Sequence, residues 1–141
     1  MDRSKTAPIP LAKFTVRTNR RTELIAITDQ IRAAVAAAGL DSGLCIVYCP
    51  HTTAGITINE NADPDVASDI ERALSVLVPA EGDYRHAEGN SDAHLKASLA
   101  GASETVIVEN GQLVLGRWQG LYFCEFDGPR TRTVFVKSIR G

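Results

Sequence analysis

All three histidines of the chain stand in segments crowded with other polar side chains. His51 follows an apolar run, whereas His86 and His94 lie near each other along the chain. Imidazole is the commonest metal ligand and the usual general acid or base near neutral pH. Three histidines would suit a catalytic divalent metal, zinc or magnesium, with Glu60 or Glu88 nearby to orient a ring or to move a proton.

The spacing of the histidines is a weak signal by itself. The interval between His86 and His94 matches no short metal motif such as H-E-x-x-H. A single histidine is more often an ordinary hydrogen-bonded or surface residue, and that alternative stays open for each of the three. Their common occurrence in polar segments favours one shared site, so we expect His51, His86 and His94 to converge in the fold.

Two further features could bind an anion. A helix that begins near Asn90 would offer free backbone N–H groups, and Gly89 would allow a phosphate to approach closely. Simple capping by Asn90 or Ser91 explains the same residues equally well. Arg130 and Arg132 share strand parity, and planar guanidinium groups bind phosphate well. A solvated sheet edge or a salt bridge between subunits is the alternative for this pair.

Composition limits the classes of protein that the chain can represent. With 141 residues, 44% hydrophobic and 23% charged, it fits one globular domain, with residues 1–7 as a loose terminus. The net charge of −2 gives no reason to expect nucleic acid as a partner, and no apolar run approaches the length of a membrane span. We interpret Cys45, Cys49 and Cys124 as buried reduced thiols, which predicts a cytoplasmic protein.

Hydrophobic periodicity predicts the elements that position the polar segments. Helices are expected after Thr28-Asp29 up to Gly39, from the Asp63-Pro64 cap to Pro79, and from Asn90 or Ser91 to Gly101. Strands are expected over residues 9–17, 44–48, 54–58, 105–108, 113–115, 121–126 and 133–138. This order favours an α+β fold, with a mostly antiparallel sheet core and about three helices, over a doubly wound fold.

Several blocks of the sequence together resemble the YjbQ family, over residues 14–141. The blocks are Pro50-His51-Thr52-Thr53-Ala54, Asn59-Glu60, Asp63-Pro64, the run from His86 through Gly89-Asn90-Ser91-Asp92-Ala93-His94, the segment from Ser103 to Leu121 that contains Trp118-Gln119, and Glu125-Phe126-Asp127-Gly128-Pro129-Arg130. One residue departs from the family pattern. Arg117 stands where the family usually has threonine, which places a long cation beside Trp118.

The resemblance implies a β-sandwich-like core, a homotrimer and a polar site near a subunit boundary. It also implies an enzyme of small phosphorylated metabolites that is similar to secondary thiamine-phosphate synthases, which join a pyrimidine diphosphate to a thiazole phosphate and release pyrophosphate. The expected catalytic residues are His51, His86, His94, Glu60 and Asn90. The expected anion-binding or substrate-binding residues are Thr52, Thr53, Gln119, Arg130 and Arg132.

Two other functions remain open at this point. A metal-dependent hydrolase could use the three histidines to activate water. A non-catalytic trimer could hold a metal or an anion, and the absence of a recognised nucleophile or phosphate-binding loop motif keeps this alternative open.

Overall fold

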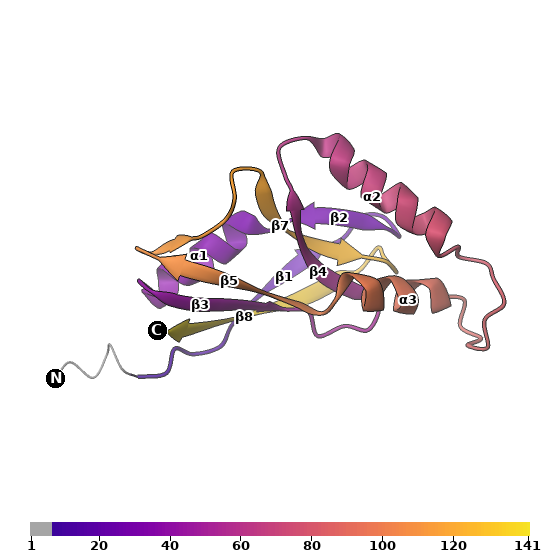
Figure 1. Ribbon diagram of the computed structural model, residues 1–141. Coiled ribbons are helices and arrows are strands. Elements are labelled where there is room, and N and C mark those ends of the chain that lie inside the picture. The colour runs from indigo at the N-terminus through magenta and orange to yellow at the C-terminus, as the bar shows by residue number, and fades with distance from the viewer. Residues whose placement is uncertain (1–6) are drawn as a thin grey trace.

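The computed structural model describes residues 7–141, which form two sheets and three helices (Figure 1). The prediction of a loose terminus over residues 1–7 falls, except for Ala7, outside the described residues. The elements in chain order are β1 (Ala12–Arg17), β2 (Glu23–Ala26), α1 (Thr28–Ala38), β3 (Gly43–Tyr48), β4 (Ala54–Glu60), α2 (Pro64–Leu77), α3 (Ser91–Ala100), β5 (Ser103–Glu109), β6 (Gln112–Leu113), β7 (Gln119–Glu125) and β8 (Thr131–Arg140).

Antiparallel pairing accounts for both sheets. The larger sheet has the strand order β1-β8-β3-β5-β6, and the smaller has the order β2-β7-β4. β8 lies between β1 and β3, so the larger sheet pairs strands from early and late parts of the sequence. The predicted α+β fold with a mostly antiparallel core and three helices is confirmed.

β2 was not among the strands predicted from the sequence. Glu23–Ala26 is only four residues long, which is too short for an alternating pattern to be recognised. Its strand character comes from pairing with β7, where Leu24 lies opposite Cys124 and Ile25 opposite Phe123. Partners so far apart in the chain leave no local signal.

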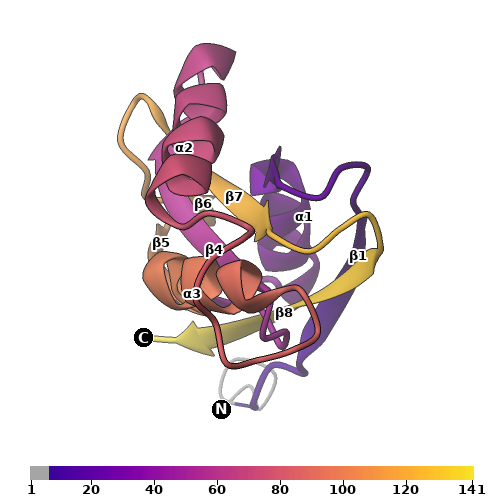
Figure 2. The same ribbon diagram turned by 90° about the vertical axis from the view of Figure 1, so that its right-hand side faces the viewer.

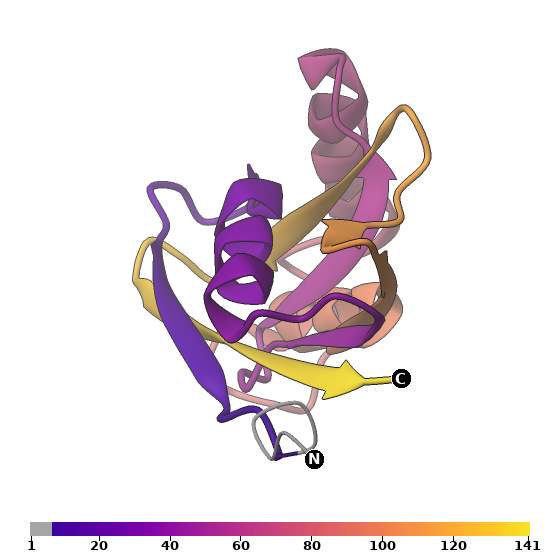
Figure 3. The same cartoon turned by 90° about the vertical axis from the view of Figure 1, so that its left-hand side faces the viewer.

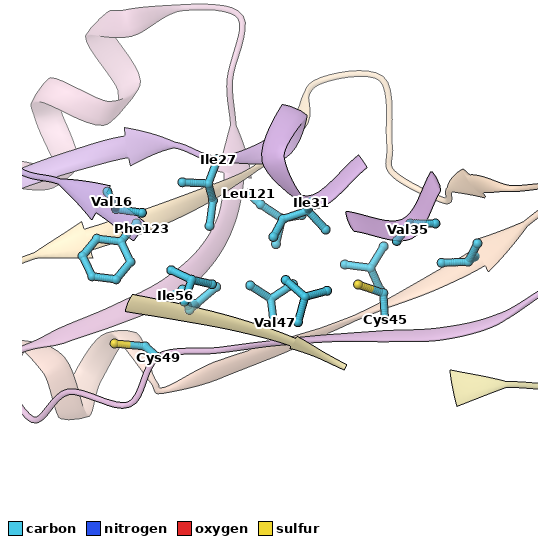
Figure 4. Close-up of a cluster of buried hydrophobic side chains, with 14 of the residues drawn as sticks. Val16, Ile27, Ile31, Val35, Cys45, Val47, Cys49, Ile56, Leu121 and Phe123 are labelled. Carbon is cyan, nitrogen blue, oxygen red and sulfur yellow. The ribbon is translucent and has the colours of Figure 1, made fainter. Parts of the chain in front are cut away.

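The main core fills the space between the two sheets (Figure 4). Alternate residues of a strand point to one face, so Cys45 and Val47 of β3 point inward and are fully buried. Ile56 of β4 and Phe123 of β7 meet them from the other sheet. Burying one such aliphatic or aromatic side chain contributes about 1.5–3 kcal/mol.

α1 closes one side of this core, as Figure 3 shows. Its buried residues Ile31 and Val35 lie one turn apart, which gives the helix a single apolar face. Gly39 ends the helix in the left-handed conformation, with φ 64°, as the sequence predicts. The Thr28 hydroxyl accepts a hydrogen bond from the Leu121 backbone N–H, which ties the start of α1 to β7.

α2 begins as predicted but is less buried than its apolar stripe suggests. Asp63 caps it by accepting a hydrogen bond from the Asp65 N–H, and Pro64 is its first residue. No residue of α2 is fully buried. Only one side of its stripe packs against the second core cluster, whose buried members are Leu24, Ala93, Ala97, Tyr122, Cys124 and Phe126.

α3 lies against β4, on the same side of the molecule as α2 (Figure 2). The predicted pair Leu95 and Leu99 does share a face, but this face is exposed. The buried face of α3 instead carries small and charged residues, which are Ser91, Asp92, Ala93, Lys96 and Ala97. At its end, the Ile56 N–H of β4 donates to the Gly101 carbonyl.

The outward face of the larger sheet carries uncovered apolar side chains. Leu44 of β3 lies between Ile107 of β5 and Ile139 of β8, and all three are between 42% and 54% exposed. Tyr48 and Leu11, at the other end of this face, are 46% and 56% exposed. None of the described helices is long and apolar enough to cross a membrane.

Candidate functional site

A buried charge cluster fixes α3 in position. Asp92 is completely buried and accepts hydrogen bonds from Lys96, at 3.0 Å, and from Arg21, at 2.9 Å. Burial alone would raise the pKa of the Asp92 carboxyl, but the bonds from Lys96 and Arg21 outweigh burial, and the pKa is lowered. With these charges turned inward, His94 lies on the accessible part of the helix surface.

This cluster was not predicted from the sequence. Asp92 and Lys96 stand four residues apart on a predicted helix, the spacing at which opposite charges meet, and this was the available signal. The same spacing is common on solvated helix faces, so it does not reveal that the pair is buried. Arg21 joins the pair from a loop before β2 that no pattern connects to α3.

His86 and His94 come together at the first half of α3. Their ring centroids lie 5.3 Å apart with the planes at 80°, so one ring edge faces the other ring. Both rings line a cavity of about 440 Å³, and the remaining lining residues are Asp83, Tyr84, Arg85, Ser91 and Leu95. The Nε2 atom of His86 also lies 3.8 Å from the Glu88 carboxylate.

A second cavity, of about 550 Å³, lies beside the second half of α3. His51 and His94 both line it, together with Thr52, Ala54, Ala97, Ser98, Gly101 and Ala102. His94 therefore lines both cavities. It lies against the ring of His86 and shares the second cavity with His51.

One ring nitrogen of His51 accepts a hydrogen bond from the backbone. The Thr133 backbone N–H donates to His51 Nε2 at 2.9 Å. Burial, together with the positive charge of Arg132, lowers the pKa of the imidazole below its usual value. His51 is therefore neutral near pH 7.

The predicted three-histidine metal site is not formed within one chain. Among residues 7–141, no group of three histidine, cysteine, aspartate or glutamate side chains is placed to hold a metal ion. His51 also uses its Nε2 atom to accept the Thr133 hydrogen bond. The donor set of a single chain thus does not fit zinc or magnesium, and we assign no chemical step to a metal.

Arg132 has a structural position instead of the predicted anion-binding one. Its side chain is 3% exposed, and it forms an ion pair with the fully buried Glu125. The same guanidinium donates to the carbonyl and the hydroxyl of Thr53. Arg132 and Thr53 thus join β8 to the loop that carries His51, and their polar groups are already paired.

Asn90 and Arg130 meet at Asp127. The Asn90 side-chain amide donates to the Asp127 carboxylate at 2.9 Å, and Arg130 pairs with the same carboxylate at 3.0 Å. Asn90 Oδ1 is the one buried side-chain polar atom in the described part of the chain without a hydrogen-bond partner. Arg130 is half-exposed, so it keeps the capacity to bind an anion.

Glu60 and Gln119 lie at the far end of β4 from the histidines. The two residues are paired across β4 and β7. From Ala54 to Glu60 the extended strand spans about 20 Å, which separates Glu60 from the His51 end of the sheet. Glu60 accepts a hydrogen bond from the Asp63 N–H, and Gln119 accepts one from the Gly116 N–H.

Trp118, next to Gln119, does not pack into the core. Its side chain is 54% exposed, and the Arg117 guanidinium lies 4.7 Å from the ring centroid. The threonine expected at position 117 from the family resemblance could not make this cation–π contact, because it has no charge to stack.

The two-sheet fold and the cavities on either side of His94 define an α+β protein with a polar site around one short helix. The chain belongs to the UPF0047 family of YjbQ-like proteins, whose model matches residues 12–141. The expected family membership is confirmed.

Relatives match nearly the whole chain. The UPF0047 protein YugU of Bacillus subtilis is 56% identical over 130 residues, covering 92% of this chain and 98% of the relative. A UPF0047 protein of Methanocaldococcus jannaschii is 52% identical and covers 92% of this chain and 94% of its own.

Solved structures have the same fold. An uncharacterised conserved protein of the family from Clostridium acetobutylicum has a TM-score of 0.89 at 55% identity, and the match covers 91% of this chain and 99% of the other. A hypothetical protein from Aeropyrum pernix has a TM-score of 0.90 at 36% identity and covers 94% and 99%.

Proposed function

We propose that the protein is a small-metabolite transferase that resembles thiamine-phosphate synthases and works as a cytoplasmic homotrimer. The observation that carries this proposal is the position of His94, which lies between two cavities and contacts the imidazole of His86. Two adjoining cavities with a shared polar wall suit a reaction that joins two small substrates. The three buried free cysteines are consistent with a reducing compartment.

The proposed reaction is a substitution at carbon. The ring nitrogen of the thiazole phosphate attacks the methylene carbon of the pyrimidine diphosphate, and a C–N bond forms. The C–O bond to the diphosphate breaks, and pyrophosphate leaves with the electron pair. The enzyme must therefore align the substrates and stabilise the charge that develops on pyrophosphate.

The cavity at the first half of α3 is the better candidate for the diphosphate. Arg85 supplies a positive charge there, and the two imidazole rings supply N–H donors. Its position next to the start of α3 adds the positive end of the helix dipole. The second cavity, with His51 and Ser98, would then hold the other substrate.

Self-association accounts for two features that a single chain leaves unexplained. The apolar outward face of the larger sheet, with Leu44, Tyr48 and Ile107, suits burial against a second copy of the chain. Glu60 and Gln119 lie too far from the histidines to act in the same chain's cavities. In the proposed trimer these two residues reach the site of a neighbouring copy.

Of the two alternatives, the metal-dependent hydrolase has no specific support, because one chain does not supply a three-ligand metal site within residues 7–141. The non-catalytic trimeric binder differs from the transferase in a measurable way. It would bind a phosphorylated ligand or a metal without turning substrates over.

Calorimetric titration with the pyrimidine diphosphate and, separately, with the thiazole phosphate tests the proposed substrate class. Wild-type protein should bind both saturably, whereas His94→Ala should weaken both, since His94 lines both cavities. Arg72→Ala is a matched control, because Arg72 is 78% exposed on α2 and, among residues 7–141, forms an ion pair with Asp69 alone. Equal binding by wild type and His94→Ala would contradict the proposed site.

A further inference from the structure

His51 accepts a hydrogen bond from β8 beyond the point where β8 is paired with β3. β3 pairs with β8 only as far as Tyr48, which lies opposite Phe135. Beyond that point the Thr133 N–H has no β3 residue to bond, and His51 Nε2 accepts its hydrogen bond instead. On its other side Thr133 remains paired with Thr15 of β1, so its backbone is fixed in the sheet.

This bond determines where the imidazole carries its proton. A ring nitrogen that accepts a hydrogen bond is unprotonated, and a neutral imidazole then carries its proton on the other nitrogen. His51 is therefore the Nδ1–H tautomer. Breaking the bond would leave the Thr133 N–H, a part-buried donor, without its partner.

The Nδ1–H group is free to bind a ligand. Within residues 7–141 no protein group bonds His51 Nδ1, and this atom is not among the buried unpaired side-chain atoms. The ring lines the cavity of about 550 Å³ beside His94 and Ser98. A donor without a protein partner on a cavity wall is suited to a ligand that presents an acceptor atom.

The free N–H donor favours an anionic acceptor. Burial, Arg132 and Arg130 lower the pKa of the ring, whereas Glu125 raises it. Both arginines are paired, Arg132 with Glu125 and Arg130 with Asp127, so the gain comes from the hydrogen bond itself. A bond from Nδ1–H to a charged phosphate oxygen is stronger than one between neutral groups.

We propose that His51 is a neutral Nδ1–H donor to a phosphate oxygen of a substrate in this cavity, and that its Nε2 atom is neither a metal ligand nor a general base. The identity of the ligand rests on the proposed function. The direction of the Thr133 bond does not, because it is a property of the ligand-free protein.

The tautomer can be measured directly. In protein labelled with ¹⁵N-histidine, long-range proton–nitrogen correlation spectra distinguish Nδ1–H from Nε2–H rings, and His51→Gln identifies the His51 signals. We expect the Nδ1–H form in ligand-free protein. An Nε2–H ring would overturn the proposal.

Two variants separate the two nitrogens of His51. His51→Gln places an oxygen near Nε2 that can still accept the Thr133 bond, but it removes the donor at Nδ1. His51→Asn places an N–H near Nδ1 but loses the acceptor for Thr133. In titrations with inorganic phosphate, we expect His51→Gln to bind at least about tenfold more weakly and His51→Asn to bind within about threefold of wild type.

Thermal unfolding should show the opposite order. His51→Gln should melt close to wild type, and His51→Asn should melt several degrees lower. Tight anion binding by His51→Gln would overturn the donor role. Absence of phosphate binding by wild type, together with an Nδ1–H ring, would refute the phosphate ligand but not the direction of the Thr133 bond.

Discussion

Buried charges near the site connect single residues to the stability of the whole chain. The carboxylate of Glu125 accepts hydrogen bonds from Arg132, Thr18 and two backbone N–H groups, and no part of it is exposed. A buried ion that loses its partner remains uncompensated in a medium of low polarity. Arg132 is therefore expected to matter more for folding than for substrate binding.

Arg132→Met should lower the free energy of unfolding by about 3–5 kcal/mol, because it leaves the Glu125 carboxylate buried and unpaired. Arg130→Met is the control. Arg130 is 49% exposed and pairs with Asp127 near the surface, so its loss should cost about 0–1 kcal/mol. Urea unfolding of the two variants and wild type measures both values. Similar losses for the two arginines would contradict the structural assignment of Arg132.

The same carboxylates predict how stability depends on pH. In the folded protein the pKa values of Asp92 and Glu125 are lowered, because the hydrogen bonds from their basic partners outweigh burial. Each group thus contributes stability that is fully present above its unfolded pKa and lost as pH falls through the lower folded pKa.

We therefore expect a decline in the free energy of unfolding that begins below about pH 5 and steepens toward about pH 3. Urea unfolding at a series of pH values measures this decline. The Asp92→Asn variant should show a shallower slope, since it lacks one of the two groups. A free energy of unfolding that stays constant down to pH 3 would show that neither carboxylate is stabilised by folding.

Among elements, α3 is positioned by a close approach of two backbones. A Cβ atom added to Gly55 of β4 would lie 2.5 Å from the carbonyl oxygen of Gly101, which follows α3. Real Cβ atoms do not come this close to a backbone oxygen, and the Ile56 N–H bonds this same carbonyl. Glycine at position 55 thus lets α3 lie directly against the sheet, with His94 between the two cavities.

Gly55→Ala should lower the free energy of unfolding by about 1–3 kcal/mol and weaken ligand binding, because α3 must move away from β4. Gly116→Ala serves as the control, since its added Cβ would meet only the flexible side chain of Gln119. Urea unfolding together with titration of the phosphorylated substrates measures both effects. Wild-type stability and binding in Gly55→Ala would refute the role of this contact.

How far the sequence predicts the elements depends on the range of the interactions that form them. α1 and α2 have local signals in their periodicity, and α2 begins at its predicted Asp63 cap. The predicted Thr28-Asp29 cap of α1 is wrong, because the helix already begins at Thr28 and Ile27 stands at its N-cap without a side-chain hydrogen bond. β2 depends on a partner about a hundred residues away, so nothing local predicts it. α3 was predicted by its ends, but the burial of Asp92 and Lys96 depends on Arg21, which only the fold brings near.

The site shows the same division. Polar density in the sequence identified His86 and His94, which the structure brings together. The density of polar residues could not show that Glu60 and Gln119 lie at the far end of β4 from the histidines. Their position depends on the register and the direction of β4 and β7. Strand parity suggested a common face for Arg130 and Arg132, but Arg130 lies before β8 begins and Arg132 points into the interior.

At the scale of the whole molecule, the outward face of the larger sheet is the expected contact between subunits of the proposed trimer. Leu44, Ile107 and Ile139 form a row across three strands, and Tyr48 lies beside Phe135. An interface of standard size removes about 800 Å² from each partner, and a five-stranded face offers a surface of this order.

Ile107→Asp should dissociate the proposed trimer into folded monomers, because it places a charge in the apolar row, directly opposite Leu44. Light scattering coupled to size-exclusion chromatography measures the mass, and circular dichroism checks the fold. Val76→Asp is the control, as Val76 is 77% exposed on α2, away from this face. A monomeric wild type would refute the trimer. A trimeric Ile107→Asp variant would show that the subunits meet at another surface.

The central claim is that the cavities on either side of His94 carry out a transferase reaction. The most direct test is the initial rate of thiamine phosphate formation from the pyrimidine diphosphate and the thiazole phosphate, followed by mass spectrometry together with pyrophosphate release. We predict product in proportion to wild-type protein, a loss of at least about a hundredfold in His94→Ala, and an unchanged rate in Arg72→Ala. Product formation at the background rate by wild type, or at the wild-type rate by His94→Ala, would contradict the claim.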